Sequence, residues 1–162
     1  MADRHAAHGK EVEYDSVLVA FEDNPFHEET VATAARLAAH RRRGIHVISL
    51  FNVPLDLSLD EPLAEEESAA QSKVEQAKLV AGQRVTGHVT RVRPGQAGNA
   101  IADEAESIRA EAIVMQLDYR GQTPLYGRTL QTVLRRRPCR VIVVAQPQLA
   151  AAAPRRAMAS SA

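Results

Sequence analysis

Residues 111–144 read EAIVMQLDYRGQTPLYGRTLQTVLRRRPCRVIVV, and this stretch decides the fold class. The apolar run at 112–115 predicts a strand buried on both faces, and the apolar run at 141–144 predicts a second strand. Between them, Leu130, Val133 and Leu134 share one face of a helix that Pro138 ends. A strand, a helix and a second strand predict a right-handed βαβ unit. Its loop at 116–129 then lies at the carboxyl end of the first strand, where open α/β sheets bind ligands.

The rest of the chain repeats this alternation of strand and helix. Apolar runs predict strands at 16–21, 45–51 and 84–92, the last near a sheet edge. Helical periodicity predicts helices at 28–43, 63–81 and 97–109, with Gly44 and Gly82 ending the first two. The pattern predicts an α/β, Rossmann-like fold: a single open five-stranded parallel sheet with helices on both faces.

Composition narrows the class of protein. The 162 residues predict one domain at 14–145, with a flexible arm at 1–13 and a disordered tail at 146–162. A net charge of zero and 4% aromatic residues argue against nucleic-acid binding. No apolar run approaches the roughly 20 residues that span a bilayer, so we expect no membrane insertion. The single cysteine, Cys139, predicts no internal disulfide and favours a cytoplasmic protein, with the thiol as a small buried group.

Two short motifs at the expected ligand edge carry the chemistry. Gly127, Arg128 and Thr129 open the last helix, either as an anion-binding turn or as an ordinary capped turn, and the spacing leaves both interpretations open. Glu22 and Asp23 follow the first strand, either as a magnesium-binding pair or as a plain acidic loop. A phospho-acceptor receiver domain is disfavoured, because an Asp is missing after the third predicted strand and a Lys after the fifth.

Other polar groups predict no enzyme. The arginine triplets at 41–43 and 135–137 close helices, so we interpret them as complements to the helix dipole rather than as phosphate sites. His5 and His8 are interpreted as part of a polar arm rather than as metal ligands. No Ser-His-Asp, H-x-x-x-H or G-x-S-x-G arrangement is present, so we predict no catalytic residue and no metal site.

Three segments together resemble the universal stress protein family. They are SVLVAFEDN at 16–24, AIVMQ at 112–116 and GRTLQTVLRRRPCRVIVV at 127–144, and the resemblance covers residues 14–145. It implies a five-stranded parallel sheet of order 3-2-1-4-5. The segment PLYGRTLQTVL at 124–134 resembles the divergent variety that is attached to the cytoplasmic ends of amino-acid permeases, which implies contact with a membrane transporter.

The resemblance also implies a nucleotide site, in altered form. ATP-binding members carry an acid after strand one and a run G-x-x-G-x(9)-G-[ST] after strand four. Gln116 stands at the first glycine, Tyr119 near the second, and the loop is shorter than in the family. Phe51, or a neighbour up to Val53, stands at the contact from strand two. The candidate nucleotide-binding residues are Glu22, Phe51, Met115, Gln116, Gly121, Gly127, Arg128 and Thr129.

Two functions follow from these observations. One is a non-catalytic signalling or regulatory module with a degenerate nucleotide site, which acts through dimerisation or transporter contact. The other is an ATP- or AMP-binding member with an altered phosphate loop and, at most, slow ATP hydrolysis. The family's dimer implies pairing through the last strand, at Val141, Val143 and Ala145, whose uncovered edge invites a second chain. The alternative is an edge covered by the alanine-rich tail or by a transporter domain.

Overall fold

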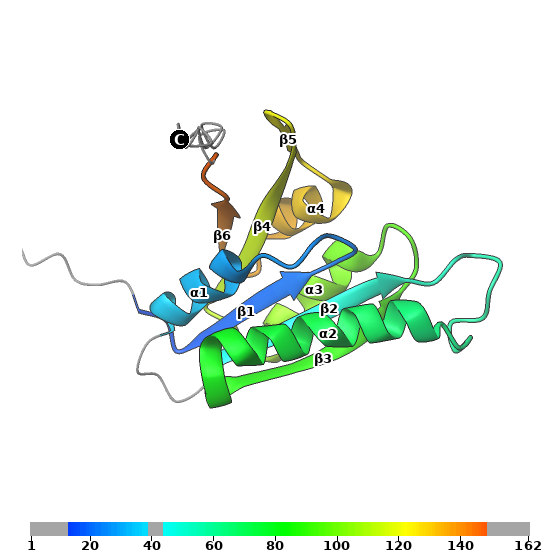
Figure 1. Ribbon diagram of the computed structural model, residues 1–162, viewed down its shortest axis with the longest axis horizontal. Coiled ribbons are helices and arrows are strands. Elements are labelled where there is room, and N and C mark those ends of the chain that lie inside the picture. The colour runs from blue at the N-terminus through cyan, green and yellow to red at the C-terminus, as the bar shows by residue number, and fades with distance from the viewer. Residues whose placement is uncertain (1–12, 39–43, 149–162) are drawn as a thin grey trace, which may run out of the picture.

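The computed structural model of the protein describes residues 13–38 and 44–148 (Figure 1). Three predictions therefore fall partly or wholly outside the described residues. They concern the arm at 1–13, the end of the first helix with the arginine triplet at 41–43, and the tail at 146–162.

Five parallel strands form the main sheet. They are β1 (Ser16–Phe21), β2 (Gly44–Asn52), β3 (Val85–Val92), β4 (Ala112–Arg120) and β6 (Arg140–Ala145). Parallel pairing joins them in the order β3-β2-β1-β4-β6. This is the predicted order 3-2-1-4-5, counted over the parallel strands, and it confirms the predicted fold class. All six residues of β1 are buried, as expected for a central strand covered on both faces.

Helices cover both faces of this sheet, and each face has its own core (Figure 1). On one side lie α1 (Glu28–Leu37) and α2 (Ala64–Ala81), which bury residues such as Val31 and Val74 against the strands. On the other side lie α3 (Ala97–Ser107) and α4 (Arg128–Arg136), which bury Ile101 and Val133. A 3-10 turn at Gly82–Arg84 connects α2 to β3. The predicted helix stop Gly44 instead opens β2, with a φ of 67°.

The loop predicted at residues 116–129 is wrong in its first part, because β4 continues to Arg120. A short antiparallel strand, β5 (Thr123–Leu125), pairs with the end of β4 and makes a sixth strand. Arg120 faces Thr123, so only two residues form the turn. Gly121 has a φ of 61°, which suits the first position of a two-residue hairpin turn. The hairpin therefore replaces the irregular loop that the apolar pattern predicted.

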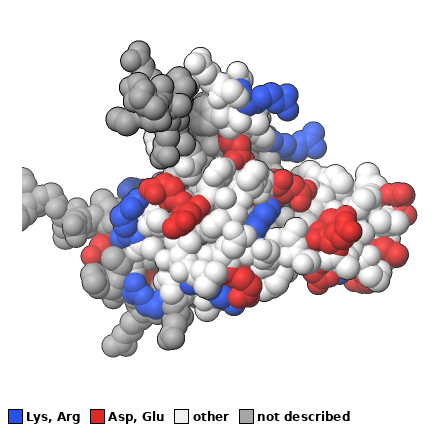
Figure 2. Space-filling view, viewed as in Figure 1, with Lys and Arg blue, Asp and Glu red and all other residues white. Residues whose placement is uncertain are grey.

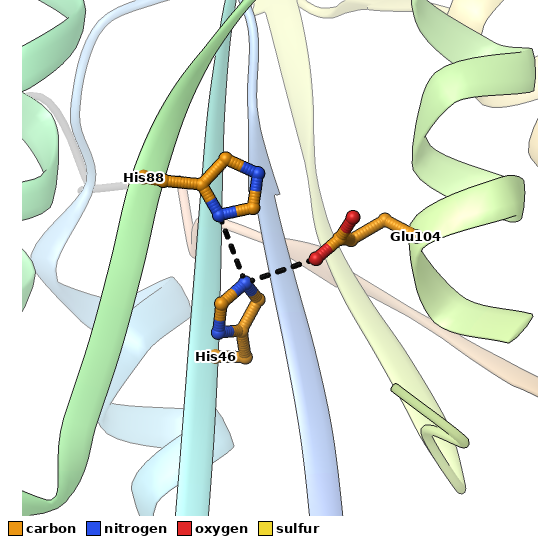
Figure 3. Close-up of side chains that lie close together, drawn as sticks. All are labelled: His46, His88 and Glu104. Atoms are coloured by element: carbon orange, nitrogen blue, oxygen red, sulfur yellow. Dashed lines mark hydrogen bonds and ion pairs between the residues drawn. The ribbon is translucent and has the colours of Figure 1, made fainter. Parts of the chain in front are cut away.

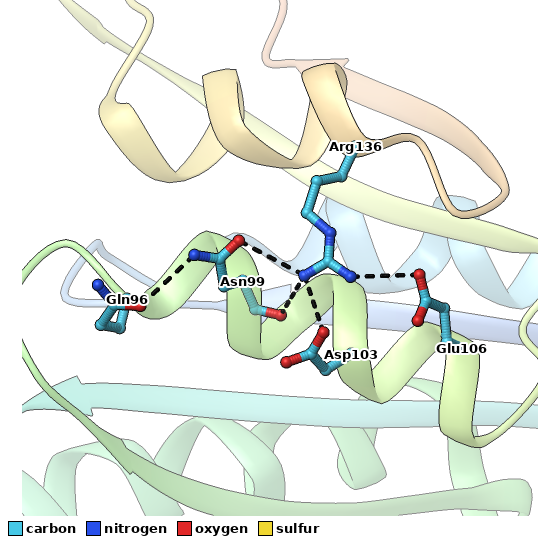
Figure 4. Close-up of polar contacts among 5 residues, drawn as sticks. All are labelled: Gln96, Asn99, Asp103, Glu106 and Arg136. Atoms are coloured by element: carbon cyan, nitrogen blue, oxygen red, sulfur yellow. Dashed lines mark hydrogen bonds and ion pairs between the residues drawn. The ribbon is translucent and has the colours of Figure 1, made fainter.

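One arginine of the 135–137 triplet links the two helices of the second layer (Figure 4). Arg136 of α4 pairs with Asp103 at 2.8 Å and Glu106 at 3.2 Å on α3, and donates to the Asn99 carbonyl at 3.2 Å. The Arg136 guanidinium is therefore occupied by groups of α3 and not by an external anion. Arg136 thus joins α3 to α4, in keeping with the interpretation that the triplet is not a phosphate site.

The surface shows acidic and basic side chains side by side, with a gathering of acids at one end (Figure 2). Glu65, Glu66 and Glu67 lie in the first turn of α2, where they complement the helix dipole. Within the described residues, no helix combines the length and the apolar character needed to cross a membrane.

The close contact between α3 and α4 yields a stability prediction. A Cβ atom added at Gly98 would lie 2.6 Å from the Cβ of Thr132 and 2.9 Å from the carbonyl oxygen of Thr129. Gly98→Ala should therefore destabilise the protein by about 1–3 kcal/mol through overpacking, although alanine is the better helix former. The loss should appear as a fall of several degrees in Tm.

Gly127→Ala is the matched control for this prediction. Gly127 has a φ of −64°, and a Cβ added there meets no atom within 4 Å. Because glycine is a better N-cap residue than alanine, Gly127→Ala should lower Tm slightly, and by less than Gly98→Ala does. If Gly98→Ala is as stable as the parent, then α3 and α4 can move apart to accept the extra methyl group without a loss of stability.

Candidate functional site

A cavity of about 180 Å³ lies at the carboxyl ends of β1 and β4, beside the start of α4. This is the edge of an open α/β sheet at which ligands bind. The residues that line it are Ala20, Glu22, Asp23, Asn24, Ile101, Met115, Gln116, Asp118, Leu125, Gly127, Thr129 and Leu130. Apolar side chains of the core that α3 and α4 cover form its floor. Polar groups from the loop after β1, from the end of β4 and from the start of α4 form its rim.

Five of the predicted nucleotide residues meet at this cavity. The structure brings together Glu22 after the first strand, Met115 and Gln116 of the fourth strand, and Gly127 and Thr129 at the start of the last helix. The other three predicted residues do not line the cavity.

Phe51, Gly121 and Arg128 lie elsewhere, each for a physical reason. Phe51 is 1% exposed and packs with Val53 and Ala70, beneath the guanidinium of Arg91, whose carbon lies 5.5 Å from the ring centroid. Gly121 is part of the hairpin turn. The Arg128 side chain is exposed and lies against the turn at Gly95.

The loop after β1 is tied to β4 by side-chain hydrogen bonds. The backbone N–H of Glu22 donates to Oδ1 of Asn24 at 3.1 Å. The amide of Asn24 donates in turn to Oδ2 of Asp118 at 2.9 Å. Asp23 accepts a hydrogen bond from the Asn52 amide at 3.1 Å. These contacts hold the acidic loop in one conformation at the mouth of the cavity.

The Gln116 side chain is the central contact of the site. It is 7% exposed, and its amide donates to the Pro25 carbonyl at 2.8 Å and to Oδ1 of Asp118 at 2.9 Å. It thereby bridges the loop after β1 and the end of β4, where the family pattern has a glycine. Its carbonyl oxygen, Oε1, is buried without a hydrogen-bond partner. A buried unpaired acceptor costs about 1–3 kcal/mol, so a ligand donor would be favoured beside it.

The start of α4 offers an anion-binding surface to the same cavity. Gly127 is the N-cap residue, no side chain caps the helix, and no described atom lies where its Cβ would stand. The first N–H groups of a helix have no intrahelical acceptors, and the helix dipole favours negative charge there. The geometry therefore permits a carboxylate or a single phosphate to approach at Gly127 and Thr129.

Acidic residues oppose that approach. Glu22, Asp23 and Asp118 lie at the cavity, and the cation beside them is Lys73 of α2, whose ammonium group donates to the Glu22 carbonyl. Burial lowers the pKa of Lys73, and the three carboxylates raise it part of the way back. His27 lies 3.5 Å from Asp118. A polyphosphate at this mouth would need a divalent cation, for which Glu22 and Asp23 are the available carboxylates.

Asn24, Lys73 and Asp118 were not predicted as site residues. Asp118 had a usable signal, because residues i and i+2 of a strand point to the same side, as Gln116 and Asp118 do. Lys73 had none, since it approaches from α2, far away in sequence. Cys139 packs beside the second core, and burial raises the pKa of its thiol, which disfavours the nucleophilic thiolate.

Comparisons with known proteins agree on the fold. A universal stress protein in complex with cAMP is 17% identical, with a TM-score of 0.55, over 82% of this chain and 97% of that one. The Archaeoglobus fulgidus universal stress protein in complex with dAMP is 18% identical, with a TM-score of 0.57, over 82% and 98%. A family member from Burkholderia pseudomallei is 17% identical, with a TM-score of 0.58, over 81% and 96%.

No match was found among curated protein sequences. The family model of the universal stress proteins matches residues 13–145, which include every strand and helix of the described part of the chain and the whole cavity. The chain therefore belongs to the universal stress protein family.

Proposed function

We propose that this protein is a non-catalytic regulatory module whose nucleotide site is closed to ATP. The observation that carries the proposal is the bridge from Gln116 to Pro25 and Asp118. It fills the place where the family pattern has a glycine, and the hairpin of β4 and β5 occupies the place of the phosphate loop. Backbone N–H groups paired in a strand ladder are not free to bind phosphate oxygens.

The size and the charge of the cavity support the same proposal. Sites for drug-sized ligands measure about 300–1,000 Å³, whereas this cavity measures about 180 Å³. A more open hollow of about 500 Å³ lies beside it, over Asp23, Asn24 and Asp118. Three carboxylates at its mouth would repel a triphosphate. If the site does not bind ATP, the protein would act through contact with another protein.

The edge of β6 is the surface that we propose for such contact. Within the described residues β6 pairs with β4 alone, so its outer edge has free backbone groups. Val143 is 37% exposed, and Val141 and Ala145 lie along the same strand. Pairing with a second copy across a two-fold axis would satisfy this edge. A membrane transporter is the alternative partner, as the resemblance of residues 124–134 to the permease-attached variety implies.

A mononucleotide such as AMP is the second candidate, as a regulatory ligand. The apolar floor of Met115, Ile101 and Leu130, the unpaired Oε1 of Gln116 and the uncapped start of α4 favour it. Two of the similar solved structures are complexes with cAMP and dAMP, and each of these ligands has a single phosphate. A single phosphate could bind at Gly127 without the first two glycines of the family pattern, which this chain lacks.

Titration calorimetry with ATP and magnesium tests the closed site. We expect no saturable heat below about 1 mM ATP. Gln116→Gly should not restore binding, because the hairpin, and not the side chain alone, occupies the phosphate loop. Low-micromolar ATP affinity in the parent protein would contradict the proposal.

A thermal shift with AMP separates the second candidate from the first. A genuine ligand at a hundredfold excess over Kd stabilises the fold by about 2.7 kcal/mol, which raises Tm by several degrees. Gly127→Ala should abolish that shift, because a Cβ would stand where the phosphate approaches. Leu79 of α2 is 85% exposed and does not line the cavity, so Leu79→Ala is a suitable control. The absence of any AMP shift leaves the protein–protein role as the proposed function.

Sedimentation of two Val143 variants tests the dimer. Val143→Pro removes one backbone donor from β6, and Val143→Lys places like charges near the two-fold axis. We expect the parent to sediment as a dimer at tens of micromolar and both variants as monomers. Circular dichroism checks that each variant is folded. A monomeric parent would rule out the dimer and favour a covered edge.

A further inference from the structure

Three side chains that are far apart in sequence meet on the sheet face that α3 covers (Figure 3). They are His46 of β2, His88 of β3 and Glu104 of α3. Nε2 of His46 lies 3.2 Å from Nδ1 of His88 and 3.2 Å from Oε1 of Glu104. The three ligand atoms all lie within 4.8 Å of one another.

The register of the sheet explains this meeting. His46 pairs with Thr86 and Ile48 pairs with His88, so the two histidines are diagonal neighbours on one face. Glu104 stands three residues after the buried Ile101, which places both on the same face of α3. The backbone thus presents three potential ligands from three elements to one point.

Two of the three separations match those of a coordination shell, and the third is at most 4.8 Å. Ligand atoms about 2.1 Å from a tetrahedral zinc ion lie about 3.4 Å apart. The two separations of 3.2 Å are close to that value. One proton on Nε2 of His46 can be donated in good geometry to only one of its two neighbours, whereas a cation is bound by all three groups.

The surroundings of His46 fix the orientation that a metal requires. Nδ1 of His46 lies 2.9 Å from the hydroxyl oxygen of Thr86. When Nδ1–H donates to this hydroxyl, the lone pair of Nε2 points to the centre of the cluster. The side chains of His46 and Glu104 are 21% and 23% exposed, and His88 is exposed, so water can reach the centre.

We propose that His46, His88 and Glu104 bind a divalent transition-metal ion of the zinc type, with water as the fourth ligand. Two imidazoles and one carboxylate suit Zn²⁺, Co²⁺, Ni²⁺ or Cu²⁺. Mg²⁺ and Ca²⁺ prefer shells made entirely of oxygen and are excluded by the two nitrogen ligands. The ion would join the edge strand β3 to β2 and to α3.

Metal binding to the full chain tests this proposal, after a chelator has removed bound metal. Calorimetry with Zn²⁺ should show one ion per chain, and Co²⁺ should give the visible absorption of a four-coordinate ion. Zn²⁺ should also raise Tm by several degrees, because it binds the folded chain. His88→Ala and Glu104→Gln should each weaken binding by about tenfold or more.

A double variant, His5→Ala with His8→Ala, is the matched control. These two histidines lie outside the described residues and are close together in sequence, so they could bind Zn²⁺ independently of the proposed site. The control should bind Zn²⁺ as the parent does. His88 is exposed, so metal-free His88→Ala should melt where the metal-free parent melts. The proposal is overturned by a parent that binds no Zn²⁺, by full binding in His88→Ala, or by binding that the arm variant loses.

Discussion

The amide group of Gln116 donates hydrogen bonds to the Pro25 carbonyl at 2.8 Å and to Asp118 at 2.9 Å from a position that is 7% exposed. A buried amide left without acceptors would cost about 1–3 kcal/mol, so these partners are fixed in place. Asp118 in turn accepts from Asn24, which also accepts from the backbone of Glu22. Gln116 is therefore the side chain that links the loop after β1 directly to the end of β4, and Asn24 and Asp118 extend the same network.

The same interaction explains why β4 does not end where its buried run ends. Asp118 must lie beside Gln116, two residues along an extended chain, to accept its hydrogen bond. The strand then continues to Arg120, and Gly121 allows the turn back into β5. An irregular phosphate-binding loop and this extended, paired backbone cannot occupy one place. The chain retains the family fold, with a paired hairpin at residues 116–125 in place of the irregular loop that the sequence pattern predicts.

Helix α3 connects this edge to the proposed metal site. Ile101 lines the cavity, and Glu104, one turn later, faces His46. Both side chains lie on the face of α3 that packs against the sheet. A metal ion at Glu104 would hold that face in position, and Arg136 already ties the outer side of the same helix to α4.

The sequence predicted well what depends on apolar periodicity. The buried runs located the five parallel strands, because such strands are apolar on both faces, and the family resemblance supplied their order. It failed at residues 116–125, where β4 leaves the core and its side chains become polar, so that the apolar signal ended before the strand did. Phe51 does not reach the cavity, because its side chain lies on the face of β2 that packs against Ala70 of α2. The apolar pattern alone does not show to which face a residue at a strand end points. His46 and His88 lie 42 positions apart, and only the pairing of β2 with β3 brings them together.

A crystal structure of the protein grown with millimolar ATP and magnesium tests the central claim most directly. The account predicts that Gln116 still bridges Pro25 and Asp118, that β4 and β5 remain paired, and that no triphosphate occupies this edge. A structure in which β4 ends before Gln116 and residues 116–127 wrap around the phosphates would contradict it.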